Sequence, residues 1–285
     1  MCIFEDYITN KPCYTVPVEK KKISGPLNIL ITAGGASEKI DDVRRITNSA
    51  TGALGAKIAD AFAACGRECN IVYICPENAV RPAAKPKQVI VANDVNAVED
   101  AVRRSCAETV FDVVVHSMAI GDYRIRAVSD ADMMTGGVLE NLSVLVCGDS
   151  SSPEEAVRDA ILSPPVIREA KISSDRDNLV LVLEKAPKII ALYRGLLPEA
   201  VIVGFKLLSG AGDEELVNVG HALLVKNDCD FVLANDMRTI RAVHADGRDQ
   251  HEGLLIDREG NYKRAGGKEG IALLIVESVL GLFCP

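Results

Sequence analysis

The feature that most constrains the fold is a regular alternation of short aliphatic runs with amphipathic segments, which begins near residue 27. The aliphatic runs predict strands at 27–32, 70–75, 88–92, 110–116, 179–183, 201–205 and 231–234. Between and after them, helical spacing of apolar residues predicts helices at 52–65, 95–106, 187–197, 214–226 and 268–282. Such alternation implies right-handed crossovers between parallel strands. We therefore expect an α/β fold, with a three-layer, doubly wound, mainly parallel, Rossmann-like sheet.

Two segments depart from this alternation. Residues 125–178 contain paired glycines, a serine run and paired prolines, and a long excursion of this kind inside a domain is usually functional or mobile. Residues 241–263 predict a β-hairpin arm with turns at 246–247 and 259–261. We expect one domain over 27–285, preceded by an N-terminal extension over 1–26.

Charge and composition argue against several functional classes. The net charge is −8, and the one basic cluster, at 20–22, is most simply a solvated tail, so we expect no nucleic-acid partner. No apolar stretch reaches the roughly 18 residues of a membrane span, and residues 1–26 lack the apolar core of a signal peptide. The nine cysteines include no C-x-x-C pair, which favours small buried side chains in a reducing compartment. These features predict a cytoplasmic protein without a membrane partner.

The loop after the first predicted strand is rich in glycine. Gly34, Gly35 and Ala36 would let a ligand approach the backbone, whose N–H groups can cradle a phosphate. However, sixteen residues separate Gly35 from Gly52, so this is not the tight G-x-G-x-x-G turn of a dinucleotide site. The next strand also ends in Cys75 and not in a ribose-binding acid, and no G-K-[ST] of a P-loop is present.

The segment between those glycines is more specific. It ends at Gly52, at the start of a predicted helix whose free amides would attract anions. Arg44 and its neighbour Arg45 could bind phosphate or carboxylate, and Asn48 could bind an uncharged polar group. Ser49 and Thr51 are candidate donors or helix caps, so this segment predicts an anion site.

Further polar and glycine residues follow other predicted strands, at 116–124, 204–206 and 235–236. Carboxyl ends of parallel strands meet at one edge of a sheet, where open α/β sheets bind ligands. We therefore expect these loops and the glycine loop to form one site.

Six motifs in this order resemble the phosphopantothenoylcysteine synthetase family over about residues 26–282. They read ITAGGASEKIDDVRRITNSATGALG, HSMAIGDYR, AKISS, APKII, VGFKLL and VKNDCDFVLANDM. The resemblance implies a ligase of coenzyme A biosynthesis that activates 4′-phosphopantothenate with CTP and Mg²⁺, forms an acyl-cytidylate, and transfers the acyl group to cysteine. It also implies a mobile flap insertion within about residues 125–178 and a homodimer. The 241–263 hairpin is the expected dimer arm, since a two-stranded ribbon needs something to pack against. Many bacterial relatives carry a fused flavin-dependent half; none of its sequence is present here, so we expect no flavin.

The resemblance also assigns roles to individual residues. Asn48 resembles an asparagine that contacts the acyl-nucleotide, and Arg44 an arginine near it. Ala119 lies where backbone groups meet the pantothenate part, and Asp122 resembles the residue that holds the nucleotide ribose. Lys171 matches the first lysine of the family's flap motif. Serines follow it here where relatives have further lysines, which leaves a second flap cation in doubt.

Two more strand ends complete the expected site. Phe205 lies where the end of a strand meets the nucleotide base, and its backbone matters more for this role than its ring does. Asn235 is a candidate for substrate binding. The metal ligands are not identified by any motif.

Each role has a structural alternative. Asn48 could cap the helix at Gly52, and Arg44 could pair with Glu38 or Asp41 at the surface. Asp122 could be a turn residue, Lys171 a solvated lysine, Asn235 a cap, His116 a packing residue at a strand end, and Phe205 a core aromatic. For the whole protein, the rivals are an NAD(P)-dependent reductase on the same fold and a non-catalytic homologue.

Overall fold

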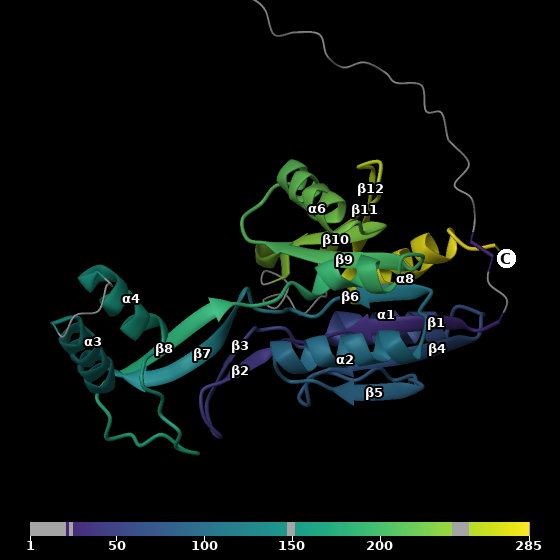
Figure 1. Ribbon diagram of the computed structural model, residues 1–285. Helices are drawn as coiled ribbons and strands as arrows, with labels where there is room; N and C mark the ends of the chain where they lie inside the picture. Colours follow the sequence, from purple (N-terminus) through teal and green to yellow (C-terminus); the bar gives the residue numbers. More distant parts are fainter. Residues whose placement is uncertain (1–20, 23–24, 147–151, 241–250, 285) are drawn as a thin grey trace, which may run out of the picture.

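A twisted sheet of eight strands forms the body of the molecule (Figure 1). The computed structural model describes residues 21–22, 25–146, 152–240 and 251–284. Six strands are parallel: β1 (Leu27–Thr32), β4 (Cys69–Cys75), β5 (Gln88–Val91), β6 (Val113–His116), β9 (Val201–Leu208) and β10 (Phe231–Asp236). Their spatial order is β5-β4-β1-β6-β9-β10, so the winding reverses between β1 and β6. This confirms the doubly wound, Rossmann-like fold.

Helices cover both faces of this sheet and make the expected three layers. On one face, α1 (Ala53–Ala63) and α8 (Gly267–Leu280) bury Phe62 and Ile275 against the strands. The other face carries α2 (Val95–Glu108), η1 (Ile189–Leu192), α5 (Tyr193–Leu196) and α6 (Asp213–Asn227). The α2 helix begins as expected, because the Asp94 carboxylate accepts a hydrogen bond from Ala97 N at 2.9 Å.

The segment at 179–183 is a strand, but the prediction that it joins the alternating parallel sheet is wrong. β8 (Leu179–Lys185) instead pairs antiparallel with β7 (Tyr123–Asp130) in a separate two-stranded ribbon. Between these strands lie α3 (Ala131–Val146) and α4 (Pro153–Leu162). Residues 123–185 therefore form an arm that projects from the body, at the left of Figure 1.

The expected irregularity of residues 125–178 is thus only partly correct, because regular structure occupies much of this segment. The sequence pattern hid it for two reasons. β7 mixes charged with apolar residues, and α3 contains the adjacent Gly136 and Gly137, which are weak helix formers. The α4 helix has a full capping box, formed by Ser152 and Glu155.

The predicted hairpin near the C-terminus exists, but it does not stand free. β11 (Glu252–Ile256) and β12 (Tyr262–Gly266) pair with each other and extend the main sheet, with β11 antiparallel to β10. The turn predicted at 259–261 is present, and the one at 246–247 lies outside the described residues. Because the ribbon already packs on β10, its need for a packing partner no longer argues for a dimerisation arm.

Several smaller expectations can be compared with the structure. Cys75 and Cys229 are buried as expected, Cys106 is only partly buried, and Cys147 lies outside the described residues. Lys21 is not simply a solvated tail residue, because its N–H donates to Leu282 O at 2.9 Å. No described helix is both long and apolar enough to span a membrane.

Candidate functional site

The carboxyl ends of β1 and β6, where the winding reverses, meet through backbone hydrogen bonds. Gly35 forms an isolated parallel bridge with Ala119, in which Ala119 N donates to Gly34 O at 2.8 Å and Ala36 N donates to Ala119 O at 3.0 Å. The structure therefore brings the two predicted loops together at the switch point, where ligands bind in folds of this kind.

The glycines of the first loop allow neighbouring segments of the chain to pack closely against it. A Cβ atom added at Gly35 would lie 2.2 Å from Asn48 O. Gly34 has φ +92°, and an added Cβ there would lie 2.8 Å from Pro76 Cδ. Both glycines and Ala36 are buried, so their first role is to admit neighbouring chain segments; a phosphate-binding role stays a prediction.

The start of α1 lies against this loop. Its N-cap is Gly52, at φ +81°, and no side chain caps the helix. Thr51 Oγ1 accepts only a long bond from Ala53 N, at 3.4 Å, and Ser49 is exposed. A helix N-terminus with half-buried backbone and no capping side chain suits an anionic ligand.

Asn48 is positioned by the hairpin of β2 (Ser37–Lys39) and β3 (Arg45–Thr47), which it directly follows. Its side-chain Nδ2 donates to Ala119 O at 3.1 Å, so it does not cap α1. This contact ties the predicted acyl-nucleotide residue to the predicted pantothenate-facing backbone.

His116 ends β6 and is 8% exposed. Its Nδ1 lies 2.7 Å from Thr32 Oγ1 and 3.1 Å from the Tyr193 hydroxyl. Burial lowers the pKa of His116 to about 4, because the interior disfavours the charged imidazolium. The ring is therefore neutral near pH 7, which agrees with a packing role at the strand end.

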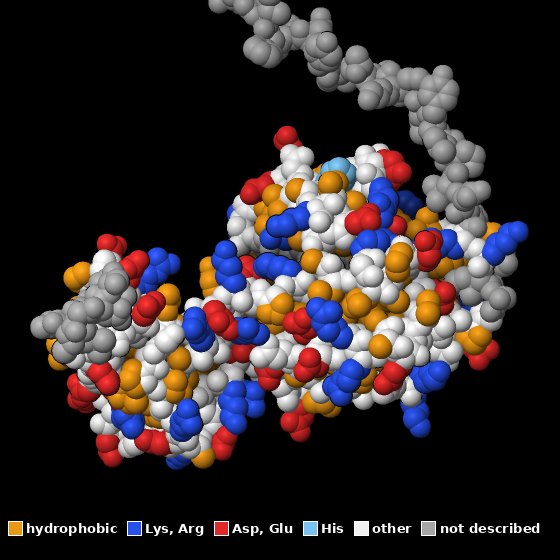
Figure 2. Space-filling view, viewed as in Figure 1, with side chains coloured by type: hydrophobic (Ala, Val, Ile, Leu, Met, Phe, Trp, Pro, Cys, Tyr) orange, Lys and Arg blue, Asp and Glu red, His pale blue; other side chains and the backbone are white. Residues whose placement is uncertain are grey.

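Asp122 is an exposed residue at the edge of the site. It pairs with Lys188, and its pKa is lowered, first by the hydrogen bond from Lys188, with a smaller Coulomb contribution from Lys206. Sequence reasoning missed Lys188, although it stands in the quoted motif APKII, whereas Lys206 belongs to the strand end at 204–206 that was expected to join the site. Figure 2 shows charged side chains of both signs crowding the junction between arm and body.

Phe205 and Asn235 occupy neighbouring strands of the sheet. β9 extends to Leu208, so Phe205 lies inside the strand and not at its end, but it lies beyond the last pairing with β6 at Val203. Asn235 lies in β10 and is 8% exposed, with Nδ2 2.7 Å from His251 Nε2. The Asn235 side chain is thus bonded to another side chain, and its substrate-binding role stays a prediction.

Lys171 is exposed, on an irregular loop that returns from α4 to β8. With Arg44 and Ser173 it lines an open cleft of about 430 Å³, completed by Val43, Ile172 and Ser174. This cleft lies at the tip of the β2–β3 hairpin, whereas Asn48 follows its base. Among the described residues, no hydrogen bond or ion pair joins Lys171 to Asn48, whose side chain bonds to Ala119 O.

Arg44 forms an ion pair with Asp41, as expected if its role is structural. Its Nε and Nη2 lie 3.0 and 2.6 Å from Asp41 Oδ2, and Nη2 also donates to Ile172 O at 2.9 Å. The Arg44 guanidinium, as the largest cause, holds the pKa of the Asp41 carboxyl far below its usual range. Sequence reasoning missed Asp41 as a site residue, although its spacing of three from Arg44 was visible.

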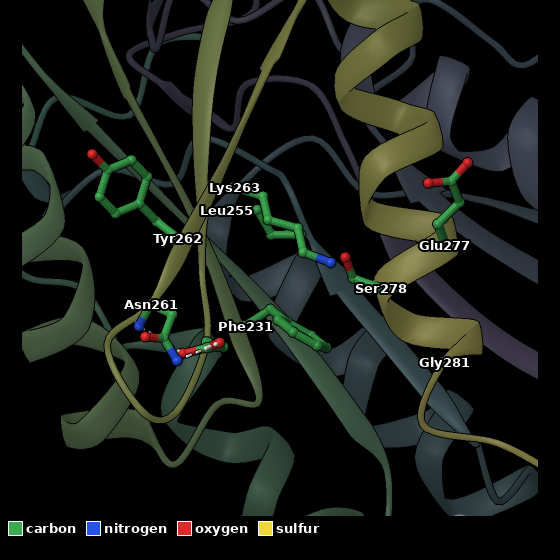
Figure 3. Close-up of a pocket in the computed structure, with 9 residues that line it drawn as sticks. Phe231, Leu255, Asn261, Tyr262, Lys263, Glu277, Ser278 and Gly281 are labelled. Carbon is green, nitrogen blue, oxygen red and sulfur yellow. Dashed lines mark hydrogen bonds between the residues drawn. The ribbon is translucent and has the colours of Figure 1, made fainter. Parts of the chain in front are cut away.

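A second cavity lies at the opposite edge of the sheet and contains none of the predicted site residues. It measures about 300 Å³ and lies between β12 and the end of α8. Figure 3 shows Lys263 extending from β12 towards Ser278 of α8, while Tyr262 points away from that helix. We therefore place the candidate site at the carboxyl edge of the sheet.

No group of three or more His, Cys, Asp or Glu side chains suited to a metal ion occurs among the described residues. Mg²⁺ commonly binds through one or two carboxylates together with substrate phosphates and waters. A nucleotide-bound Mg²⁺ therefore needs no cluster of three protein ligands.

Comparison with known proteins gives a consistent result. The DNA/pantothenate metabolism flavoprotein C-terminal domain family matches residues 25–142 and 156–282. The coenzyme A biosynthesis bifunctional proteins CoaBC of Thermococcus kodakarensis and Methanocaldococcus jannaschii are each 26% identical, over 81% and 88% of this chain. The matches cover 45% and 50% of those proteins, so this chain spans about half the length of these relatives.

Solved structures show the same fold. The DNA/pantothenate metabolism flavoprotein from Streptococcus pneumoniae is 30% identical, with a TM-score of 0.69 over 90% of this chain and 99% of that one. A Cab2 mutant in complex with phosphopantothenate-cysteine is 17% identical, with a TM-score of 0.58 over 90% of this chain and 85% of that one.

Proposed function

This chain belongs to the DNA/pantothenate metabolism flavoprotein C-terminal domain family, and from that premise we propose that it is a ligase joining 4′-phosphopantothenate to L-cysteine. The observation that carries the proposal is the convergence of the motif loops at the switch point, where Gly35 pairs with Ala119 and Asn48 bonds to Ala119 O. Its relatives act in coenzyme A biosynthesis, and a neighbour of the same fold binds phosphopantothenate-cysteine.

The proposed reaction has two steps. The carboxylate of 4′-phosphopantothenate attacks the α-phosphorus of CTP, forms an acyl-cytidylate and releases pyrophosphate. The amine of cysteine then attacks the acyl carbon, the bond to the phosphate oxygen breaks, CMP leaves, and the amine loses a proton. Mg²⁺, bound with the nucleotide phosphates, would neutralise negative charge during the first step.

The residues at the switch point suit the activation step. The uncapped start of α1 offers N–H groups and a positive dipole end to the nucleotide phosphates. Asn48 would donate to the acyl-nucleotide without adding charge. The backbone around Ala119, whose own N–H and carbonyl are bonded within the protein, would face the pantothenate part. Asp122 would bind the ribose, and the backbone near Phe205 would face the base.

Lys171 would supply positive charge at the phosphates when its loop approaches the nucleotide. Charge aimed at a developing anion in a site without water is among the largest contributions to catalysis. Closure of the loop would also keep water from the mixed anhydride. Arg44 is already neutralised by Asp41, which makes direct anion binding by Arg44 a weaker part of the proposal.

Four features complete the proposal: CTP as the nucleotide, a homodimer, a cytoplasmic location, and no flavin in this chain. The reductase alternative is not favoured, because the family and its relatives belong to coenzyme A biosynthesis. A non-catalytic homologue is distinguished by activity.

A pyrophosphate assay without cysteine tests the proposal. With CTP, Mg²⁺ and 4′-phosphopantothenate, we expect a burst approaching about one pyrophosphate per active site, followed by a stall while the acyl-cytidylate is protected from water. Addition of cysteine should release CMP and restart turnover. Substitution of ATP for CTP in parallel reactions would identify the nucleotide. Absence of pyrophosphate with either nucleotide, before and after cysteine, would contradict the ligase proposal and favour the non-catalytic homologue.

A further inference from the structure

The loop that carries Lys171 is bonded to the β2–β3 hairpin mainly through Ile172. Asp41 Oδ2 accepts from Ile172 N at 3.2 Å, and Arg44 Nη2 donates to Ile172 O at 2.9 Å. Both polar groups of this residue's backbone are therefore held by one ion pair. The adjacent backbone adds a contact, from Asp42 N to Ala170 O at 2.8 Å.

Asp41 is built as a rigid anchor. Its side chain is fully buried, at 0% exposure, and its carboxylate also accepts from Val43 N at 2.9 Å and Arg44 N at 2.6 Å. With the two guanidinium bonds and Ile172 N, this carboxylate has five donor atoms around it. A buried carboxylate with this many donors has little freedom to move, and removing its charge leaves those donors with a weaker acceptor.

The loop is also held from the arm. Arg176 pairs with Asp130 of β7 and, at 2.7 Å, with Glu169, whose carboxylate also accepts from Ser173 N at 3.2 Å. Ile172 itself is 2% exposed and lies in an apolar cluster made by residues of the arm and by Ile40 of the hairpin. The arm therefore shapes the loop, and the Asp41–Arg44 pair supplies the polar bonds from side chains that hold it to the hairpin leading to Asn48.

We propose that Asp41 and Arg44 form a clasp that holds Ile172 at both its N–H and its carbonyl group and thereby positions Lys171. The part concerning catalysis rests on the proposed ligase function, while the clasp itself does not. In this role both residues act through Lys171 and do not touch the substrate. Arg44 is then a positioning residue, in place of the anion-binding role that its motif suggests.

Amide hydrogen exchange of the full chain without substrates tests the clasp. In Asp41→Asn, the Ile172 amide should exchange at least about tenfold faster, as expected when a charge-assisted bond worth over about 1.4 kcal/mol is lost. Arg44→Gln should show a smaller increase in the same peptide. Asp42→Asn is the matched control, because its side chain pairs with exposed Lys39 and with no other side chain in the described part of the chain, so exchange at Ile172 should stay unchanged.

Steady-state kinetics test the positioning role. Asp41→Asn should lower kcat by about 10- to 100-fold with little change in KM, since small misplacements of a catalytic group cost about this much. Asp42→Asn should match the wild type in both constants. If Asp41→Asn does not fold, the Arg44→Gln variant carries the same two measurements, because its side chain is 42% exposed and outside the core.

The outcomes separate the two proposals. Unchanged exchange at Ile172 in both variants would overturn the clasp and show that apolar burial of Ile172 alone holds the loop. Faster exchange with unchanged kcat would overturn the positioning of Lys171. A wild-type protein that releases no pyrophosphate would overturn the ligase function, and with it the catalytic role, while the exchange result would still decide the clasp.

Discussion

The switch point and the Lys171 loop belong to one proposed site but are built differently. At the switch point, backbone meets backbone: Gly35 and Ala119 pair, and the loop residues around them are largely buried. The Lys171 loop is held by side chains, through Asp41, Arg44 and Arg176, and Lys171 itself is exposed. The two regions should therefore respond differently to substitutions. Changes at the switch point should affect folding first, and changes in the loop should affect turnover alone.

Lys171→Gln is expected to have the largest effect. It should lower turnover by about 10²- to 10³-fold, or about 3–4 kcal/mol, because a preorganised charge is lost from the phosphate site. Its urea midpoint should match that of the wild type, since the side chain is exposed. The control is Lys185→Gln, also exposed on the arm, which should retain turnover. Near-wild-type turnover in Lys171→Gln would remove this lysine from the mechanism.

Gly35→Ala should act on the other region and through folding. The new Cβ would lie 2.2 Å from Asn48 O, a backbone atom that cannot rotate away. We expect a loss of about 3 kcal/mol or more in the free energy of unfolding, measured with urea. Gly136→Ala in α3 is the matched control on the arm, where a Cβ meets nothing within 4 Å. Gly136→Ala should leave the free energy of unfolding unchanged or raise it by up to about 1 kcal/mol. An equal loss of this free energy in both variants would contradict the expected difference between the two regions.

His116 should give the switch-point region a pH dependence that begins near pH 6.5, whereas the lowered pKa values of Asp41 and Glu169, which hold the loop, act at lower pH. The folded-state pKa of His116, about 4, is below the ordinary value of 6.5, so the unfolded state takes up the proton first. Stability from this residue is therefore present above pH 6.5 and lost as the pH falls towards 4, by at most about 3 kcal/mol. His116→Asn should flatten the stability profile over this window. The pKa can also be read from the imidazole proton resonances, and a value near 6.5 would contradict the buried environment.

Asp122→Asn should have the smallest effect on stability. The exposed pair with Lys188 is expected to contribute less than about 1 kcal/mol to the free energy of unfolding. If Asp122 binds the ribose, its KM for CTP should rise about tenfold, whereas Lys188→Gln should lose the same ion pair without that rise. Parallel titrations of CTP with both variants make the comparison. Equal KM values in the two variants would assign Asp122 to the surface ion pair alone.

Much of the candidate site was predictable because it lies in local motifs at strand ends. The ends of β1 and β6 had to meet once the fold was doubly wound, which brought Ala119 to Gly35. Lys188 and Lys206 lay in motifs that were already recognised, but nothing in a sequence says that both face Asp122. The fastening of Ile172 by Asp41 joins residues 131 positions apart, and only the folded chain reveals such a contact.

The sequence by itself determined the body of this protein, from the strands of the central sheet to the start of α2 at Asp94. It did so because burial on both faces of a parallel sheet leaves an unbroken aliphatic signal, and because helix ends depend on nearby residues. Tertiary structure alone decided that β8 leaves the sheet to pair with β7, and that the hairpin of β11 and β12 becomes a sheet edge. Strand pairing joins distant segments through backbone groups that every residue has, so the side-chain pattern of one strand does not identify its partner.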